Sequence, residues 1–109
     1  MISQGENIAD NVGIREAFRA YQNYVSLHGR ESRLPGLEQF TPEQIFFISF
    51  GNIWCAKSTT ESLKQQILNG PHSPDRERVL GPLSNSEDFA RHFKCPIGNM
   101  SRAKKCILW

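Results

Sequence analysis

A long amphipathic pattern between residues 6 and 27 constrains this sequence more than any other feature. At 100° per residue, its apolar side chains fall within one stripe about 120° wide: Ile14, Ala17, Phe18, Tyr21, Tyr24 and Val25. The charged residues Arg15, Glu16 and Arg19 lie on the opposite side. The pattern predicts one long helix that buries a single face.

Two carboxylates continue this apolar stripe toward the N-terminus. Glu6 and Asp10 precede Ile14 by steps of four, so they are expected on the buried face. An ionised carboxylate is costly to bury without a partner. One interpretation is that both simply complement the positive end of the helix dipole. The other is a metal site, in which one carboxylate binds the ion and the other orients a neighbouring ligand.

The segment from residue 41 to about residue 57 predicts a second helix of unusual character. Thr41 and Gln44 form a capping box around Pro42, which favours a helix start. The segment is apolar on almost every side, so burial on several sides is expected. Because 109 residues provide a limited interior, this helix either is central or is covered by a larger body.

The remaining segments predict shorter helices. One is expected from about Thr60 to Asn69, ended by Gly70-Pro71, and a proline-containing loop follows it. Ser84 with Glu87 three residues later predicts the start of another. The expected fold class is mainly α, with one domain and an irregular tail after residue 95.

Composition excludes several classes of function. The net charge is +2, with no basic block beyond Lys104-Lys105, so nucleic-acid binding is not expected. The longest apolar run, residues 45–50, is too short to span a bilayer, and no membrane contact by this segment is expected. Three cysteines are an odd number: Cys55, Cys95 and Cys106. They are either buried thiols in an intracellular protein or, in an exported one, imply a partner elsewhere.

Residues 5–10, Gly-Glu-Asn-Ile-Ala-Asp, resemble the G-E-N-I-A-D motif of the neprilysin and endothelin-converting-enzyme zinc metallopeptidases. The likeness continues in order along nearly the whole chain, through residues 21–22, 34–37, 53–55, 72–74, 83–86 and 105–109. Val12 and Met100-Ser101-Arg102 depart from the family pattern. The resemblance implies that residues 1–109 are the C-terminal part of a thermolysin-like (zincin) peptidase domain, with several helices and without the H-E-x-x-H helix.

The same resemblance implies metal-binding and catalytic roles for three residues. Glu6 would be the third zinc ligand, beside two histidines outside this chain. Asp10 would hydrogen-bond a zinc-bound histidine and fix its orientation, although family descriptions also treat it as a proton donor. His72 would donate to the oxyanion of the tetrahedral intermediate. Without the resemblance, His72 would be interpreted as a solvated loop residue.

Three further residues match substrate-binding positions of the family. Arg78 would bind a carbonyl of the peptide, whereas its ordinary role would be a surface pair with Asp75 or Glu77. Ile53 and Trp54 would line the pocket for the residue after the scissile bond, and plain core packing is compatible with the same positions.

The resemblance also implies an extracellular parent, secreted or the ectodomain of a single-pass membrane protein, which cleaves peptides with zinc as cofactor. Cys55, Cys95 and Cys106 would then form disulfides with cysteines far upstream. The isolated chain is expected to be inactive, because the H-E-x-x-H motif lies in the N-terminal remainder of the peptidase domain, its implied partner. The alternatives are a non-catalytic short product or antigen, and an unrelated helical interaction module.

Overall fold

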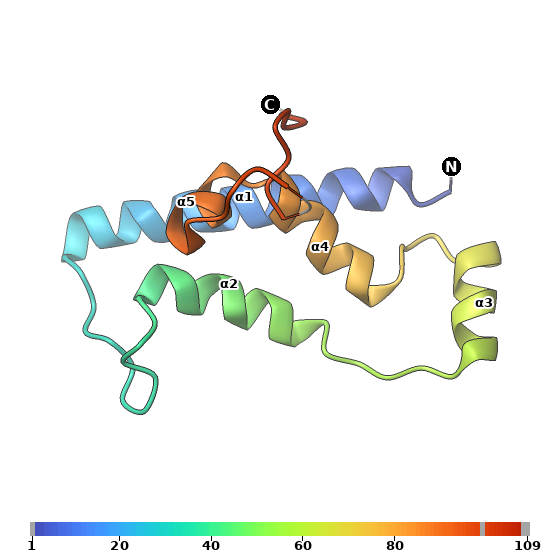
Figure 1. Ribbon diagram of the computed structural model, residues 1–109, viewed down its shortest axis with the longest axis horizontal. Helices are drawn as coiled ribbons and strands as arrows, with labels where there is room; N and C mark the ends of the chain where they lie inside the picture. Colours follow the sequence, from blue (N-terminus) through green and yellow to red (C-terminus); the bar gives the residue numbers. More distant parts are fainter. Residues whose placement is uncertain (1, 99, 108–109) are drawn as a thin grey trace.

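The chain forms five helices in a computed structural model that describes residues 2–98 and 100–107. In order they are α1 (Gln4–His28), α2 (Pro42–Ile53), α3 (Thr60–Asn69), α4 (Asp75–Asn85) and α5 (Glu87–Phe93). Figure 1 shows α1 and α2 running in opposite directions, with α3 set apart at one end. Within the described residues the tail adds an isolated β-bridge between Gly98 and Ser101. The prediction of a mainly α fold is confirmed; residues 108–109 of the terminal motif lie outside the described residues.

Helix ends follow local signals in the sequence. Gly29 ends α1 at φ 87°, a left-handed conformation that glycine adopts without strain, and its N–H donates to the carbonyl of Val25. The predicted capping box of α2 forms: Thr41 accepts from the Gln44 N–H, and the Gln44 side chain accepts from the Thr41 N–H. The bounds of α3 agree with those predicted.

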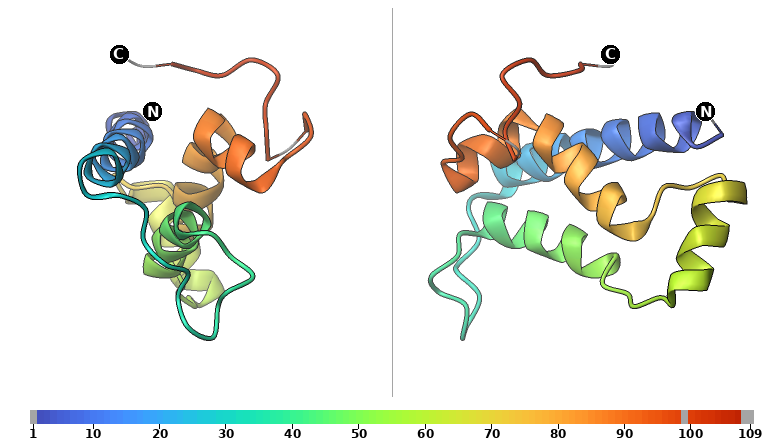
Figure 2. Two further views of the ribbon diagram at one scale, coloured as in Figure 1. Left: turned by 90° about the vertical axis from the view of Figure 1, so that its left-hand side faces the viewer. Right: turned by 45° about the vertical axis from the view of Figure 1, so that its right-hand side comes forward.

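The core is small and largely aromatic. Phe18 of α1 is 1% exposed, and it is buried with Ile14, Phe47 and Leu83. Partly buried side chains pack around this group: Tyr21, Phe46, Phe50, Val79, Phe89, Phe93 and Met100. Contacts between α1 and α4, α2 and α5, and α4 and α5 hold the helices together. In the end-on view of Figure 2, α1, α2 and the α4–α5 pair lie on different sides of the molecule's centre, and the buried residues come from α1, α2 and α4.

The predicted burial of α2 on several sides is wrong for this chain. Only Glu43 and Phe47 of α2 are buried, whereas Ile48 and Ile53 are exposed. The helix also ends at Ile53 rather than near Lys57, because the chain turns at Trp54, whose indole ring packs against Arg78. The helix is therefore not central, which leaves cover by a larger body as the open alternative.

Helix α4 was not predicted, and the start of α5 was predicted two residues too early. Gly81 and Pro82 lie inside α4 and disfavour a helix interior, which is why the segment resembles a loop in sequence. Ser84 belongs to α4, where its hydroxyl donates to the Gly81 carbonyl. The N-cap of α5 is Ser86, which accepts from the backbone N–H of Phe89.

Helices α3 and α5 both have no buried residue, but most residues of α3 are exposed, whereas most of α5 are partly buried. Within the described part of the chain, no helix is sufficiently long and apolar to pass through a bilayer.

Candidate functional site

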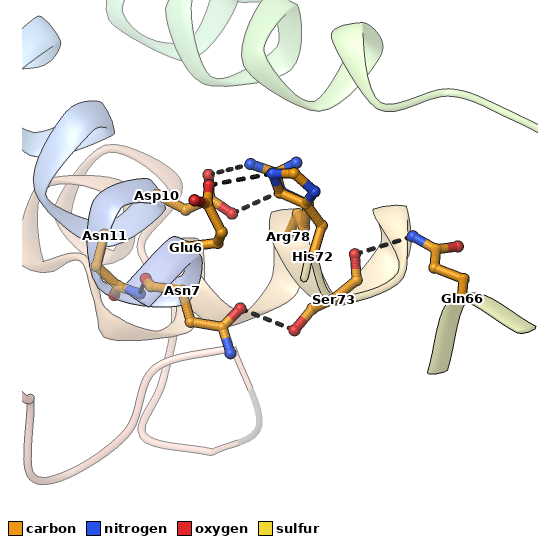
Figure 3. Close-up of polar contacts among 8 residues, drawn as sticks. All are labelled: Glu6, Asn7, Asp10, Asn11, Gln66, His72, Ser73 and Arg78. Atoms are coloured by element: carbon orange, nitrogen blue, oxygen red, sulfur yellow. Dashed lines mark hydrogen bonds and ion pairs between the residues drawn. The ribbon is translucent and has the colours of Figure 1, made fainter. Parts of the chain in front are cut away.

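The N-terminal turns of α1 present a continuous polar face to α4 and to the loop before it. Four side chains form this face: Glu6, Asn7, Asp10 and Asn11. Each contacts a different partner from residues 72–85, as Figure 3 shows for the first three. The spacing of these residues, i, i+1, i+4 and i+5, places them side by side along one edge of the helix.

The strongest of these contacts joins Asp10 to Arg78. The Nε and one terminal nitrogen of Arg78 donate to the two carboxylate oxygens, both at 2.7 Å. The side chains are 12% and 14% exposed, so the pair is largely shielded from water. The hydrogen bonds to Asp10 raise the pKa of Arg78 despite its burial, with smaller contributions from Glu6 and Asp75. This bidentate pair fixes α4 against α1, in place of the surface pairing with Asp75 or Glu77.

Trp54 reaches this cluster from the end of α2. The Arg78 guanidinium carbon lies 4.1 Å from the centre of the Trp54 ring, within the range of a cation–π contact. Ile53 is 75% exposed and lines a different cavity. That apolar groove of about 520 Å³ lies between α1, α2 and residues 31–34, and Tyr21 and Phe46 also line it. The structure thus brings Trp54 to the charged cluster and not Ile53.

His72 meets Glu6 at the open end of the cluster. The Nε2 of His72 lies 3.1 Å from a carboxylate oxygen of Glu6, and both side chains are nearly half exposed. His72 belongs to the loop of residues 70–74, which joins α3 to α4. The structure therefore brings together Glu6, Asp10, His72 and Arg78, the four residues to which polar roles were assigned.

Sequence reasoning missed the polar pair next to Glu6 and His72. The hydroxyl of Ser73 donates to the side-chain amide oxygen (Oδ1) of Asn7 at 2.7 Å, and the Ser73 backbone carbonyl accepts from the Gln66 side chain of α3 at 3.3 Å. A signal was present in the sequence, since Asn7 and Asn11 repeat the four-residue spacing of Glu6 and Asp10. The partners lie 66 positions away, however, and no local pattern identifies them.

A second missed contact ties the tail to α1. Asn85, the last residue of α4, donates to Asn11 at 3.0 Å. The same side chain donates to the carbonyl of Cys106 and accepts from its N–H, both at 2.6 Å. These residues border a cavity of about 450 Å³, which Asp10 and Ser73 also line.

The three cysteines form no disulfide with one another. Cys55 and Cys106 are exposed and Cys95 is partly buried. Their pairing with cysteines outside this chain stays a prediction.

The metal-binding capacity of the cluster is incomplete within this chain. A carboxylate and an imidazole are both suitable zinc ligands, and Glu6 and His72 place one of each 3.1 Å apart. Across residues 2–98 and 100–107, no group of three or more His, Cys, Asp or Glu side chains could hold a metal ion. Protein zinc sites normally use three or four protein ligands, so Glu6 and His72 by themselves are fewer than such a site requires.

Comparison with known proteins gives consistent relatives. Neprilysin-11 of Caenorhabditis elegans is 51% identical over 109 residues, covering 99% of this chain and 13% of the relative. Neprilysin-2 of Drosophila melanogaster is 52% identical over 108 residues, covering 98% and 14%. Human endothelin-converting enzyme 1 is 49% identical over 106 residues, covering 96% and 14%. The chain spans about one seventh of the length of these curated relatives.

A solved structure and a family model agree with these relatives. The Haemonchus galactose containing glycoprotein complex matches with a TM-score of 0.88 and 47% identity, over 94% of this chain and 17% of that one. The family model for peptidase family M13 matches residues 1–108. Because the family model and the relatives match nearly the whole chain, an unrelated helical module is excluded, and the chain belongs to peptidase family M13.

Proposed function

We propose that this chain forms one wall of the active site of an M13 zinc metallopeptidase that cleaves peptides. The proposal rests on the gathering of Glu6, Asp10, His72 and Arg78 at one end of α1, in a chain that belongs to a peptidase family. The helix α1 contributes the two carboxylates, and the segment after α3 contributes the histidine and the arginine.

Glu6 is the proposed metal ligand of this wall. Its side chain is 45% exposed at the open end of the cluster, where a carboxylate is accessible to an ion. A zinc ion bound by three protein ligands supplies an activated water for attack on a peptide bond. None of the three histidines of this chain begins an H-E-x-x-H motif. The two histidine ligands and the general base therefore belong to the N-terminal remainder of the peptidase domain, the proposed partner.

Asp10 and Arg78 retain hydrogen-bonding capacity for further roles. Each Asp10 oxygen accepts one bond from Arg78, and a carboxylate oxygen has a second lone pair that can accept from a metal-bound histidine. Arg78 uses two of its five N–H donors on Asp10, so the others can bind a peptide carbonyl. Asp10 would thus orient a ligand and hold a substrate-binding arginine at once.

His72 is the proposed oxyanion donor. Its imidazole stands beside the proposed metal ligand, 3.1 Å from Glu6, and its side chain is 44% exposed toward the open end. A preorganised donor at that place stabilises the charge that develops on the carbonyl oxygen during attack. Removing such a donor typically lowers kcat by a factor of ~10²–10³.

Several features support a larger protein body around this wall. The indole Nε1 of Trp54 is buried without a hydrogen-bond partner among the described residues. Ile53 and Ile48 of α2 are exposed although the helix is strongly apolar. We further propose that the parent is extracellular, where Cys55, Cys95 and Cys106 pair with cysteines of the remaining chain.

The experiment that tests this function places the chain in a complete peptidase. We suggest replacing the matching segment of Drosophila melanogaster neprilysin-2, which is 52% identical, with this chain. Zinc content and hydrolysis of a fluorogenic peptide are then measured for the chimera and for its Glu6→Gln variant. Loss of bound zinc and of hydrolysis in the variant is expected.

The matched control is Glu16→Gln, which changes a glutamate of the same helix that is exposed and pairs with Arg19. This variant is expected to keep both zinc and activity. Retention of zinc by Glu6→Gln would remove Glu6 as a ligand. The isolated chain is expected not to hydrolyse the peptide, and chelator-sensitive turnover by the purified chain would contradict the proposed division of the site.

A further inference from the structure

The loop that carries His72 is attached to α1 mainly through the neighbouring residue. Two polar groups of Ser73 form hydrogen bonds: the hydroxyl donates to Asn7 at 2.7 Å, and the backbone carbonyl accepts from Gln66 at 3.3 Å. Figure 3 shows these bonds on either side of Ser73, linking α1 to α3 through the loop. Asn7 and Ser73 are both partly buried, unlike the more exposed His72.

The contact of His72 itself is poorly suited to fix the imidazole. Its partner Glu6 is 45% exposed, and the histidine is 44% exposed. Pairs at such exposure contribute little, because water and salt screen them and two flexible side chains must be ordered. The hydroxyl–amide bond of Ser73 is short, neutral and partly shielded, so salt screens it less.

The chain sequence explains why one anchor suffices. Asn7 directly follows Glu6, and Ser73 directly follows His72, so the Asn7–Ser73 and Glu6–His72 contacts lie side by side between the same two segments. Asn7 is itself held on α1, because its backbone carbonyl accepts from the Asn11 amide at 2.8 Å. The Asn7–Ser73 hydrogen bond therefore sets the position of the His72 backbone relative to Glu6.

We propose that Asn7 and Ser73 are a pair of positioning residues that hold His72 beside Glu6 for catalysis. The inference rests on the proposed function, in which His72 donates to the oxyanion. Neither residue touches the reacting atoms in this proposal: they act through the placement of the histidine. Misplacement of a catalytic group by about 1 Å can cost ~10²-fold in rate, so a small shift of this loop has a measurable effect.

The test uses the neprilysin-2 chimera that carries this chain. Ser73→Ala removes the hydroxyl that donates to Asn7. It is expected to lower kcat about tenfold or more with KM within about twofold, because His72, the proposed donor to the transition state, is displaced. Ser73→Thr keeps the hydroxyl and is expected to restore kcat to within about threefold. Asn7→Leu should match Ser73→Ala, and the double variant should be no worse than either, since both remove one contact.

Two controls separate this inference from the proposed function. His72→Ala is measured in parallel: unchanged kcat in that variant would defeat the proposed role of His72 itself. A large loss in His72→Ala with normal kcat in Ser73→Ala would overturn only the positioning role. Failure of Ser73→Thr to restore kcat would also overturn it. Ser26→Ala, an exposed serine whose hydroxyl bonds to the Asn23 carbonyl, is expected to keep full activity.

A measurement on the 109-residue chain tests the geometry independently of activity. Nuclear Overhauser contacts between the His72 ring protons and the Glu6 side chain report their proximity. These contacts should weaken in Ser73→Ala and persist in Ser73→Thr, while circular dichroism confirms that both variants keep their helices. Equal contacts in the two variants would show that Ser73 does not position His72.

Discussion

The two halves of α1 are attached to the rest of the molecule by different forces. Its N-terminal turns contact the loop before α4, α4 itself and its end through hydrogen bonds and ion pairs, from Glu6 to Asn11. Its middle turns contact the other helices through buried apolar side chains, above all Ile14 and Phe18. Glu6 and Asp10, two of the residues proposed for the site, belong to the polar half of α1, and the buried core residues Ile14 and Phe18 belong to its apolar half.

This difference separates stability from chemistry along a single helix. Apolar burial is non-directional and tolerates small movements, whereas hydrogen bonds require defined distances and angles. A helix anchored by its apolar turns can therefore present carboxylates from its N-terminal turns, where the Asp10–Arg78 pair then sets their position against α4. The loss of folding stability caused by substitutions on α1 should therefore decrease from Phe18 to Glu6.

Phe18→Ala is expected to have the largest effect on folding. The side chain is 1% exposed and contacts the rings of Tyr21, Phe46, Phe47 and His92. Its removal leaves a cavity, and such changes typically cost about 3–5 kcal/mol. Urea unfolding of the chain, followed by circular dichroism, measures the loss. Tyr24→Ala on the same helix is the control, since Tyr24 is 49% exposed, and equal losses in the two variants would contradict the prediction.

Asp10→Asn is expected to have the next largest effect. It leaves the Arg78 guanidinium, which is 14% exposed, without its counter-charge, at a typical cost of about 3 kcal/mol. Because both groups are shielded, the loss should persist between about 0.1 M and 1 M salt. The measurement is a double-mutant cycle with Arg78→Met, in which the double variant should recover part of the loss. A loss that disappears at high salt would show that the pair behaves as a surface contact.

Glu43 of α2 pairs with Arg30, just beyond the C-terminal end of α1, and should make the free energy of unfolding depend on pH. Burial, the largest single influence, raises the pKa of Glu43, but its own backbone N–H, Arg30 and the Thr41 hydroxyl outweigh it and lower the pKa below the usual 4.5. A carboxyl with a lowered pKa stabilises the fold above its ordinary pKa, and this stability is lost as the pH falls through the lowered value.

Unfolding of Glu43→Gln and of the original chain should therefore differ by about 1 kcal/mol at pH 7 and converge below pH 4.5. Arg30 is 66% exposed, so its own loss of a partner adds little. Glu61→Gln on α3 serves as the control, because Glu61 is exposed. A difference that grows toward acid pH would reverse the assigned sign.

The helices whose limits depend on local signals are the part of the fold that the sequence predicted well. The period of α1, the capping box at Thr41 and the ends of α3 are local signals, and each of them is confirmed. Helix α4 was missed because Gly81 and Pro82 oppose helix formation locally, while burial of Pro82 and Leu83 in the folded chain overrides that preference.

The residues of the polar cluster were predicted individually, but the contacts between them were not. Glu6, Asp10, His72 and Arg78 were identified individually, but their pairing joins segments more than 60 positions apart. The direction of Trp54 depends on the turn at the end of α2, which separates it from Ile53. Contacts of this kind depend on tertiary packing, so they cannot be predicted from a short segment of the sequence.

Glu6→Gln is expected to have the smallest effect on folding, although it changes the proposed metal ligand. Both members of the Glu6–His72 contact are nearly half exposed, so its loss should change the free energy of unfolding by less than about 0.5 kcal/mol. Urea unfolding beside Asp10→Asn, one turn further along the same face, measures the contrast directly. If the two variants lost equal stability, the Glu6–His72 contact would be anchoring the loop, and the positioning role assigned to Asn7 and Ser73 would fail with it. If Glu6→Gln folds normally, a loss of zinc in the chimera reports the loss of a ligand rather than of the helix that carries it.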